Sequence, residues 1–219
     1  MAHAFVEALQ VGRVAPLGPN HEPSGFVKNA VLGPLAVGLL GVEGDEQADL
    51  TVHGGPEKAV YGYAAGHYAA WKAEFPQHID LFVAGGVGEN LTIAGLDETG
   101  IYVGDVHAIG SALLQVCQPR QPCFKFALRF GNSHLPKAMV KNGRAGWYYR
   151  VLQPGQIGIG DAVTLHERPN PDFRFDRLVS IVNNQDPTPD ELARLAVMPG
   201  LASRLQESAR RHLKTVQPL

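Results

Sequence analysis

Glycine and proline constrain this chain more than any other feature, because they interrupt most of its length too often for long helices. The 219 residues include 25 Gly and 16 Pro, and both types favour turns over helix interiors. Short runs rich in β-branched and aromatic residues stand between these interruptions, which is typical of strands. We predict strands within residues 5–14, 25–32, 35–42, 59–63, 90–93, 106–118 and 147–152, and short helices within residues 64–75 and 133–140.

The sequence pattern changes after residues 169–171 (Pro-Asn-Pro). Apolar residues then recur three and four positions apart, which indicates amphipathic helices. The three sets are Phe175, Leu178, Val179 and Val182; Leu192, Leu195 and Ala196; and Leu201, Leu205, Ala209 and Leu213. Residues 188–191 (Thr-Pro-Asp-Glu) have the composition of a capping box with proline at the first helical position. We predict two units, a β-rich domain over residues 1–170 and three short helices over residues 171–219.

Charge and hydropathy exclude several classes of function. The formal net charge is −2. The sequence therefore contains no indication of a basic surface that would bind nucleic acid or an anionic membrane. Residues 31–42, the most apolar stretch, are too few to span a bilayer, and the first residues lack the basic and apolar regions of a signal peptide. We therefore expect a cytoplasmic protein whose two cysteines, Cys117 and Cys123, stay separate thiols in a reducing compartment.

Cys123 lies within residues 118–125 (Gln-Pro-Arg-Gln-Pro-Cys-Phe-Lys), which place a cation on each side of the thiol. Nearby cations favour the thiolate, the form that binds metals and attacks electrophiles. If this segment is extended, Cys123 and Lys125 point to the same side of a strand. The alternative is a buried, inert thiol, and we prefer that interpretation for Cys117, which follows an apolar run. For Cys123 the surrounding residues favour a functional thiol.

Three further segments contain residues suited to an anionic ligand. Residues 52–61 (Val-His-Gly-Gly-Pro-Glu-Lys-Ala-Val-Tyr) combine paired glycines with a lysine, residues 85–92 form a glycine-rich loop, and residues 142–151 place an arginine in a turn. Taken singly, the first two are better explained as structural turns, and an exposed turn arginine explains the third nearly as well. Asp45, Asp49 and His53 recur at intervals of four residues, but a hard-metal site usually gathers more oxygen ligands.

Five segments taken in order form a familiar pattern. They are residues 44–49 (Gly-Asp-Glu-Gln-Ala-Asp), 52–61, 88–92 (Gly-Glu-Asn-Leu-Thr), 118–125 and 143–151 (Gly-Arg-Ala-Gly-Trp-Tyr-Tyr-Arg-Val). Together they resemble the MOSC family, the molybdenum-cofactor sulfurase C-terminal domain. The terminal helices resemble the 3-alpha domain that accompanies it in the YiiM-type branch of 6-hydroxylaminopurine-resistance proteins. The resemblance covers nearly the whole chain.

The resemblance implies a mainly β fold, a closed β-barrel with a few helices followed by the three-helix unit, and a bound molybdenum cofactor (Mo-molybdopterin). It also implies reduction of N-hydroxylated compounds, such as N-hydroxylaminopurines, hydroxylamines and amidoximes, to amines. The metal-ligand cysteine of the family corresponds to Cys123. The cofactor contacts correspond to Lys28, His53, Gly54, Gly55, Lys58, Asn90, Arg120, Lys125 and Arg144. A soft thiolate suits a redox metal, and cations with backbone N–H groups suit a pterin phosphate.

The expected partners are a small N-hydroxylated substrate and a separate electron-donor reductase, because the sequence contains no iron–sulfur or flavin motif. A homodimer is one assembly that we consider, whereas neither nucleic acid nor a membrane is an expected partner. Two alternatives belong to other classes of function. One is a protein that carries the cofactor or a sulfur atom on Cys123 without turnover. The other is a cofactor-free thiol enzyme in which one of the nine histidines is the base.

Overall fold

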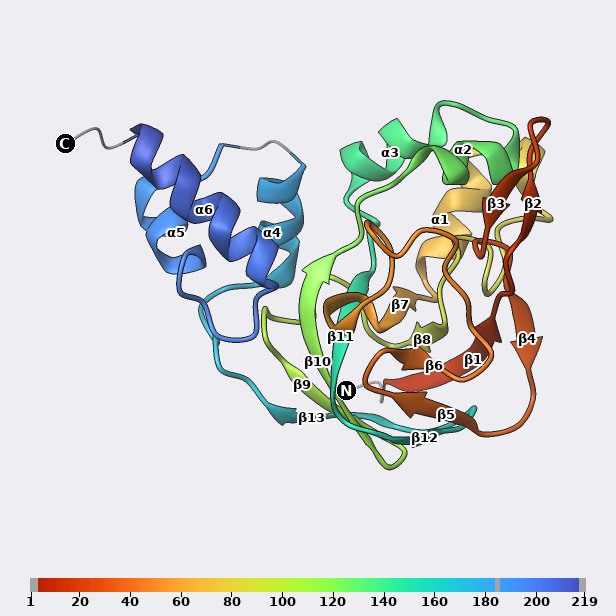
Figure 1. Cartoon of the computed structure of the whole chain (residues 1–219), viewed down its shortest axis with the longest axis horizontal. Coiled ribbons are helices and arrows are strands. Elements are labelled where there is room, and N and C mark those ends of the chain that lie inside the picture. Colours follow the sequence, from red (N-terminus) through yellow and green to blue (C-terminus); the bar gives the residue numbers. More distant parts are fainter. Residues whose placement is uncertain (1–3, 184–185, 217–219) are drawn as a thin grey trace.

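The computed structural model describes residues 4–183 and 186–216. Its strands are β1 (Phe5–Val11), β2 (Ala15–Leu17), β3 (Glu22–Ser24), β4 (Asn29–Val31), β5 (Leu35–Gly38), β6 (Gly41–Val42), β7 (Val60–Ala64), β8 (Leu91–Ala94), β9 (Val106–Ile109), β10 (Ala112–Pro119), β11 (Trp147–Gln153), β12 (Gly155–Ile157) and β13 (Val163–Glu167). Its helices are α1 (His67–Glu74), α2 (Phe124–Phe130), α3 (Leu135–Asn142), α4 (Phe175–Val182), α5 (Pro189–Leu195) and α6 (Ser203–Val216), with short 3-10 turns η1 (Pro56–Lys58) and η2 (Pro76–His78). Figure 1 shows α2 and α3 above the strands and α4 to α6 grouped to their left.

Eight strands form the main sheet in the order β13-β9-β10-β11-β7-β8-β1-β4. Neighbouring strands are antiparallel except β7 and β8, which are parallel. Burial alternates along β10, where Ala112, Leu114 and Val116 are buried while Leu113 and Gln115 are partly exposed. This alternation is expected of a strand with one face against a core. The prediction of a sheet-rich fold is therefore confirmed.

Each predicted strand has a counterpart in the structure, although two of the predicted runs contain hairpins. Residues 35–42 fold as the hairpin of β5 and β6, and residues 106–118 contain the hairpin of β9 and β10. A glycine in the left-handed region, Gly110 at φ 56°, permits the second of these turns. The alternating pattern locates the strands, but it does not distinguish one long strand from two that fold back on each other.

The two ends of the main sheet approach each other at β1. Residues 9–11 of β1 pair with β4. Residues 160–163, which lead into β13, bond to the start of β1, where the Val6 N–H donates to the Asp161 carbonyl at 2.9 Å. Strand pairing in the described part of the chain still ends at β13 on one side and β4 on the other. A fully closed barrel is therefore not observed there and stays a prediction.

Two buried clusters hold the elements together. The larger one joins the sheet to the C-terminal helices, since Trp147 and Tyr149 of β11 lie in the same cluster as Phe175, Leu178 and Leu195 of α4 and α5. The smaller cluster is largely aromatic and lies beneath α1 to α3; it includes Tyr63, Trp71, Phe82, Phe126 and Phe130. The larger core is continuous across the predicted domain boundary at residue 170.

Helix α2 is the main departure from the sequence-based prediction. It begins directly after Cys123, its N-cap residue, and ends at Gly131 with φ 60°. Residues 118–125 are therefore not extended beyond Cys123, so the condition for a shared strand face is not met and Lys125 lies in the first turn of a helix. The physical reason is that Phe126 and Phe130, four residues apart, face one way on a helix and both enter the aromatic core.

Three helices occupy the C-terminal part of the described chain, as the sequence predicts, although α6 begins at Ser203 and leaves the predicted Leu201 in the preceding turn. The capping box is confirmed, because the Thr188 hydroxyl accepts from the Glu191 N–H at 3.2 Å and a Glu191 carboxylate oxygen accepts from the Thr188 N–H at 2.8 Å. Arg177 of α4 also bonds to Glu191, at 2.6 Å, and so ties α4 to α5. All helices within residues 4–183 and 186–216 are too short or too polar to cross a bilayer.

Candidate functional site

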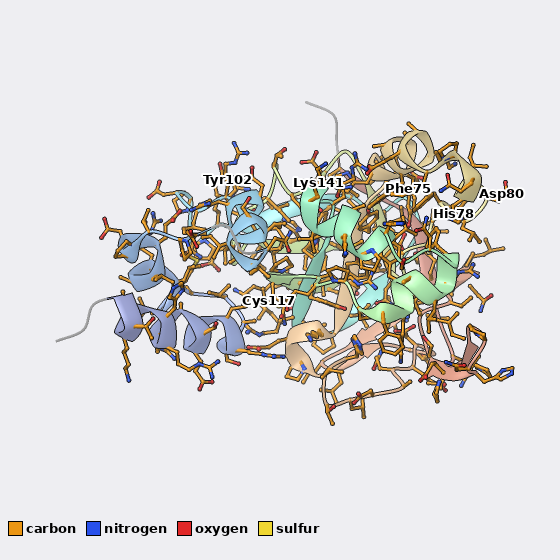
Figure 2. The ribbon with its side chains drawn as sticks, turned by 90° about the horizontal axis from the view of Figure 1, so that it is seen from above. Phe75, His78, Asp80, Tyr102, Cys117 and Lys141 are labelled. Carbon is orange, nitrogen blue, oxygen red and sulfur yellow. The ribbon has the colours of Figure 1, made fainter. Side chains whose placement is uncertain are left out.

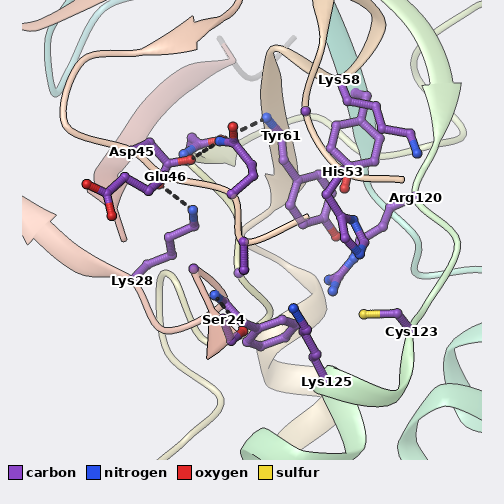
Figure 3. A pocket seen from close by; sticks show the side chains of 18 residues that line it. Ser24, Lys28, Asp45, Glu46, His53, Lys58, Tyr61, Arg120, Cys123 and Lys125 are labelled. Carbon is purple, nitrogen blue, oxygen red and sulfur yellow. Dashed lines mark hydrogen bonds and ion pairs between the residues drawn. The ribbon is translucent and has the colours of Figure 1, made fainter. Parts of the chain in front are cut away.

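One pocket collects side chains from several separated segments of the chain (Figure 3). Its lining includes most of the residues predicted as ligand contacts, namely Lys28, His53, Gly54, Lys58, Asn90, Arg120, Cys123 and Lys125. Figure 3 shows Lys28 and Asp45 at one end of this pocket and His53, Arg120 and Cys123 at the other. The strands bring these segments together, because residues 53–58 precede β7 and residues 120–125 follow β10.

Cys123 is partly exposed in the pocket, where it caps the N-terminus of α2. Burial by itself would raise the pKa of this thiol. A hydrogen bond with His53, the charge of Arg120 and the backbone N–H of Lys125 outweigh burial and lower the pKa of Cys123 to about 6. The thiolate is therefore the main form at neutral pH. Cys117 is the opposite case, because burial raises the pKa of its thiol to about 12.

Arg120 places a buried cation at the same end of the pocket. Its guanidinium lies 5.0 Å from the ring centroids of Phe26 and Tyr61 and 5.8 Å from that of Phe126. One of its nitrogens donates to the carbonyl of Val87. No carboxylate in the described part of the chain forms an ion pair with it. The Cys123 thiolate is a single negative charge beside Arg120, Lys58 and Lys125. Buried charge without full compensation is costly, so this position favours a further anion in the pocket.

Lys58 and Lys125 add two ammonium groups to the pocket. Lys58 Nζ donates to the Val52 carbonyl at 2.5 Å, and Lys125 Nζ donates to the Pro23 carbonyl at 2.7 Å. Carbonyl oxygens do not neutralise the charge, and neither lysine has an ion-pair partner among residues 4–183 and 186–216. Burial and then the charge of Arg204 lower the pKa of Lys58. Each ammonium has three donors, so both retain hydrogens for an anionic ligand.

Lys28 lies at the other end of the pocket and is already paired. Its ammonium forms an ion pair with Asp45, and the two side chains are only 6% and 4% exposed. Asp45 also accepts from the Gly12 N–H at 2.7 Å and from Gln47 Nε2 at 3.0 Å. Burial lowers the pKa of Lys28 despite the attraction of Asp45. An anionic ligand would have to compete with this carboxylate, so the uncompensated positive charge of the pocket lies at the Cys123 end.

Three of the predicted cofactor contacts either bond to other protein groups or lie outside the pocket. Asn90 lines the pocket, but its amide accepts from the Tyr61 N–H at 3.1 Å and donates to a carbonyl of β1, which links β7 to β1. Gly55, at φ 80°, precedes η1 and does not line the pocket. The structure does not bring Arg144 to the pocket, because Glu74 of α1 holds its guanidinium at 2.8 Å.

The acidic residues near His53 are also occupied by other partners. Asp45 pairs with Lys28. Asp49 accepts from the backbone N–H and the hydroxyl of Thr51 at 2.9 and 2.6 Å. Within residues 4–183 and 186–216, no three His, Cys, Asp or Glu side chains converge as a metal-binding group. The spacing of Asp45, Asp49 and His53 thus reflects turn structure in this loop.

Sequence reasoning missed the role of Glu89. Its carboxyl group is fully buried and accepts from the Gly85 N–H at 2.7 Å, the Thr92 hydroxyl at 2.8 Å and the Tyr68 hydroxyl. Burial raises the pKa of Glu89. The glycine-rich loop therefore wraps around a side chain of its own, and Gly88 at its end lines the pocket. The available signal was an acid placed inside a glycine-rich loop directly before a buried strand.

A β-rich fold whose pocket combines a thiolate with three cations that lack a carboxylate partner in the described residues is typical of a protein that binds an anionic ligand. Comparison with known proteins identifies the family. Residues 49–164, which are 116 of the 219 residues, match the model of the MOSC domain. The chain belongs to the MOSC domain family.

Relatives of the chain are found among curated proteins and among solved structures. Protein YiiM of Escherichia coli (strain K12) is 43% identical over 150 residues, which are 68% of this chain and 67% of that protein. A protein named reductase from Gibberella moniliformis is 38% identical over 168 residues, which are 76% of this chain and 30% of that protein. The crystal structure of YiiM from Geobacillus stearothermophilus is similar, with a TM-score of 0.81 and 30% identity over 96% of this chain and 99% of that chain.

Proposed function

We propose that this protein is a molybdenum-cofactor-dependent oxidoreductase that reduces N-hydroxylated compounds to amines. The observation that carries the proposal is the low-pKa thiol of Cys123 beside the buried guanidinium of Arg120, which has no carboxylate partner within residues 4–183 and 186–216. Thiolate is a soft ligand that redox metals accept, and a buried guanidinium calls for an anion. The molybdenum cofactor has both a redox metal that accepts thiolate and an anionic phosphate. Membership of the MOSC family and a fungal relative named reductase support the same proposal.

The positions of the pocket residues support distinct roles toward this cofactor. Cys123 would bind the metal, while Arg120, Lys58 and Lys125 would hold the phosphate and the pterin in place. His53 lowers the pKa of Cys123 and so favours the thiolate that would bind the metal. When bound, the cofactor supplies the two-electron redox chemistry, and the protein supplies ligation, orientation and charge.

The proposed reaction consumes two electrons and two protons. The substrate R–NHOH becomes R–NH2, the N–O bond breaks, and its oxygen leaves as water. The sequence contains no iron–sulfur or flavin motif, so we propose that a separate reductase delivers the electrons. In the fungal relative, the part that matches this chain makes up 30% of the protein, which leaves most of that chain for other segments.

Metal analysis and turnover test the proposal. Protein purified from a host that makes the cofactor should contain molybdenum and pterin, and it should reduce 6-hydroxylaminopurine with reduced viologen as an artificial donor. Arg120→Met replaces the buried charge with an apolar side chain among aromatic rings, so the protein should still fold but contain less molybdenum. Arg210→Met, on the exposed face of α6, is the matched control and should keep its molybdenum. Wild-type protein without molybdenum would refute the proposal.

The contact between Cys123 and His53 supports one other function, a cofactor-free thiol enzyme. A thiolate with an adjacent imidazole is the arrangement that nucleophilic cysteine enzymes use. Molybdenum-free protein that turns over substrate and is inactivated by alkylation of Cys123 would favour this function. Molybdenum-loaded protein that forms no amine would instead favour a carrier of the cofactor.

A further inference from the structure

Glu57 joins the wall of the pocket to the C-terminal helices. We propose that its carboxylate is a positioning residue for the molybdenum cofactor. It holds the turn η1 against the first residue of α6 and thereby fixes Lys58 at the pocket. The inference rests on the proposed function, because it gives Glu57 a role toward the same cofactor. It also gives the three-helix unit a part in the site.

The carboxylate of Glu57 is held by two elements. Its Oε1 accepts from Arg150 Nη2 of β11 at 2.7 Å and from the Ser203 N–H at 2.9 Å. Its Oε2 accepts from the Ser203 hydroxyl at 3.0 Å. Ser203 is the first residue of α6, a helix of 14 residues. The free N–H groups and the dipole of a helix N-terminus favour a negative charge at this position.

The backbone of Glu57 is anchored as well. Its carbonyl accepts from Cys117 Sγ at 3.0 Å and from Gln118 Nε2 at 2.8 Å, both in β10. The carbonyl of Cys117 in turn accepts from the Ala202 N–H at 2.9 Å. Figure 2 shows Cys117 where the C-terminal helices meet the rest of the molecule. Strands β10 and β11 and the start of α6 therefore all bond to one residue of η1.

The residues on both sides of Glu57 lie in the pocket wall. Lys58 follows it directly, and His53 and Gly54 come shortly before it. Gly54 and Gly55 have φ of 83° and 80° and no side chains that could pack, and none of the residues of η1 is buried. The turn has no core of its own, so the bonds of Glu57 hold it on one side, and the buried Ala59 leads into β7 on the other. A shift of Glu57 would move Lys58 with it.

A double-mutant cycle on the full chain tests this inference. Each variant is purified from a cofactor-competent host, and the loss of molybdenum is followed during timed dialysis. Glu57→Gln keeps the side-chain size but removes the charge, and it should lose molybdenum about tenfold faster than wild type. Lys58→Met should also lose it faster. If Glu57 acts through Lys58, the double variant Glu57→Gln/Lys58→Met loses molybdenum no faster than Lys58→Met alone.

Two further variants serve as the control and the fallback. Glu191→Gln is the same substitution in the same three-helix unit, where Glu191 pairs with Arg177 and does not line the pocket. It should retain molybdenum as wild type does. Ser203→Ala removes only the hydroxyl bond to Glu57, so it should fold and lose molybdenum about threefold faster than wild type.

Wild-type retention in both Glu57→Gln and Ser203→Ala would overturn the inference. Additive losses in the double variant would also overturn it, because additivity indicates that Glu57 and Lys58 act independently. Faster loss from Glu191→Gln would show a general effect of the helices and count against the specific role of Glu57. Wild-type protein that lacks molybdenum from the outset would refute the proposed function itself, so the two failures are distinguishable.

Discussion

The low pKa of Cys123 can be measured without any cofactor. With a pKa of about 6, roughly nine tenths of this thiol is ionised at pH 7, against about one hundredth for a thiol at the usual value of 9.0. We expect iodoacetamide to alkylate Cys123 in cofactor-free protein with a midpoint near pH 6 and a plateau above about pH 7. Cys117 is buried with a pKa of about 12, and it should not react in the folded protein.

The midpoint of this titration, and not the absolute rate, tests the reasoning. Thiolates of low pKa are weaker nucleophiles, with a Brønsted coefficient of about 0.4–0.5. A fall in pKa from 9.0 to about 6 therefore weakens the thiolate about twentyfold, while its population at pH 7 rises about ninetyfold. The net gain in rate at pH 7 is about fourfold, which is too small to identify the perturbation without the pH profile.

Two variants test whether His53 lowers the pKa of Cys123. His53→Gln removes a hydrogen bond to the thiol and should raise the midpoint by about one pH unit. His212→Gln, which replaces an exposed histidine of α6, is the control and should leave the midpoint unchanged. A wild-type midpoint above about pH 8 would refute the reasoning, and an unchanged midpoint in His53→Gln would refute the contribution of His53.

The same titration affects folding stability. The folded protein binds the proton of Cys123 less tightly than the unfolded chain does, because the folded pKa of about 6 lies below the usual 9.0. The thiolate therefore stabilises the fold fully above about pH 9, and this contribution is lost as the pH falls through 6. The difference in unfolding free energy between wild type and Cys123→Ser should shrink over that interval in urea titrations.

Three further predictions concern other residues. Cys123→Ser should lose both molybdenum and activity while Cys117→Ser keeps most of both, and normal metal content in Cys123→Ser would contradict the proposed ligand. Asp45→Asn should cost about 3–5 kcal/mol of unfolding free energy in urea, because it leaves the buried ammonium of Lys28 unpaired; adding Lys28→Met should recover most of it. Thr188→Ala should cost about 1 kcal/mol and speed amide exchange first in α5, whereas uniform exchange across the protein would argue against a local cap.

Local sequence signals predicted those elements whose stability depends on neighbouring residues. The capping box at Thr188 and Glu191 is one example, since both partners lie within four residues of each other. Helix α2 was missed because its three phenylalanines also suit a strand. What decides for a helix is the aromatic core that receives Phe126 and Phe130, and that core is built by residues far away in the sequence.

The candidate site was predictable in composition but not in its pairings. The order of the motifs indicated which residues gather at the pocket, and the sequence marks Cys123 by its flanking cations. Which acid each cation meets depends on the fold. Asp45 forms an ion pair with Lys28, and Glu74 forms one with Arg144. Arg120 forms no ion pair with a carboxylate in the described residues. Sequence proximity carries no information about such partners, because the paired groups lie on different elements.

The bond between Glu57 and Ser203 also bears on how the protein is made. A growing chain folds from its N-terminal part while the later residues are still being added. The two bonded residues are 146 positions apart, so the turn that carries Lys58 stays without its helix anchor until Ser203 has been synthesised. Before that point, the turn η1 in the pocket wall would lack its hydrogen bonds to Ser203. If the protein binds the proposed cofactor, insertion would accordingly follow the synthesis of the first residues of α6, and the C-terminal helices would set its timing.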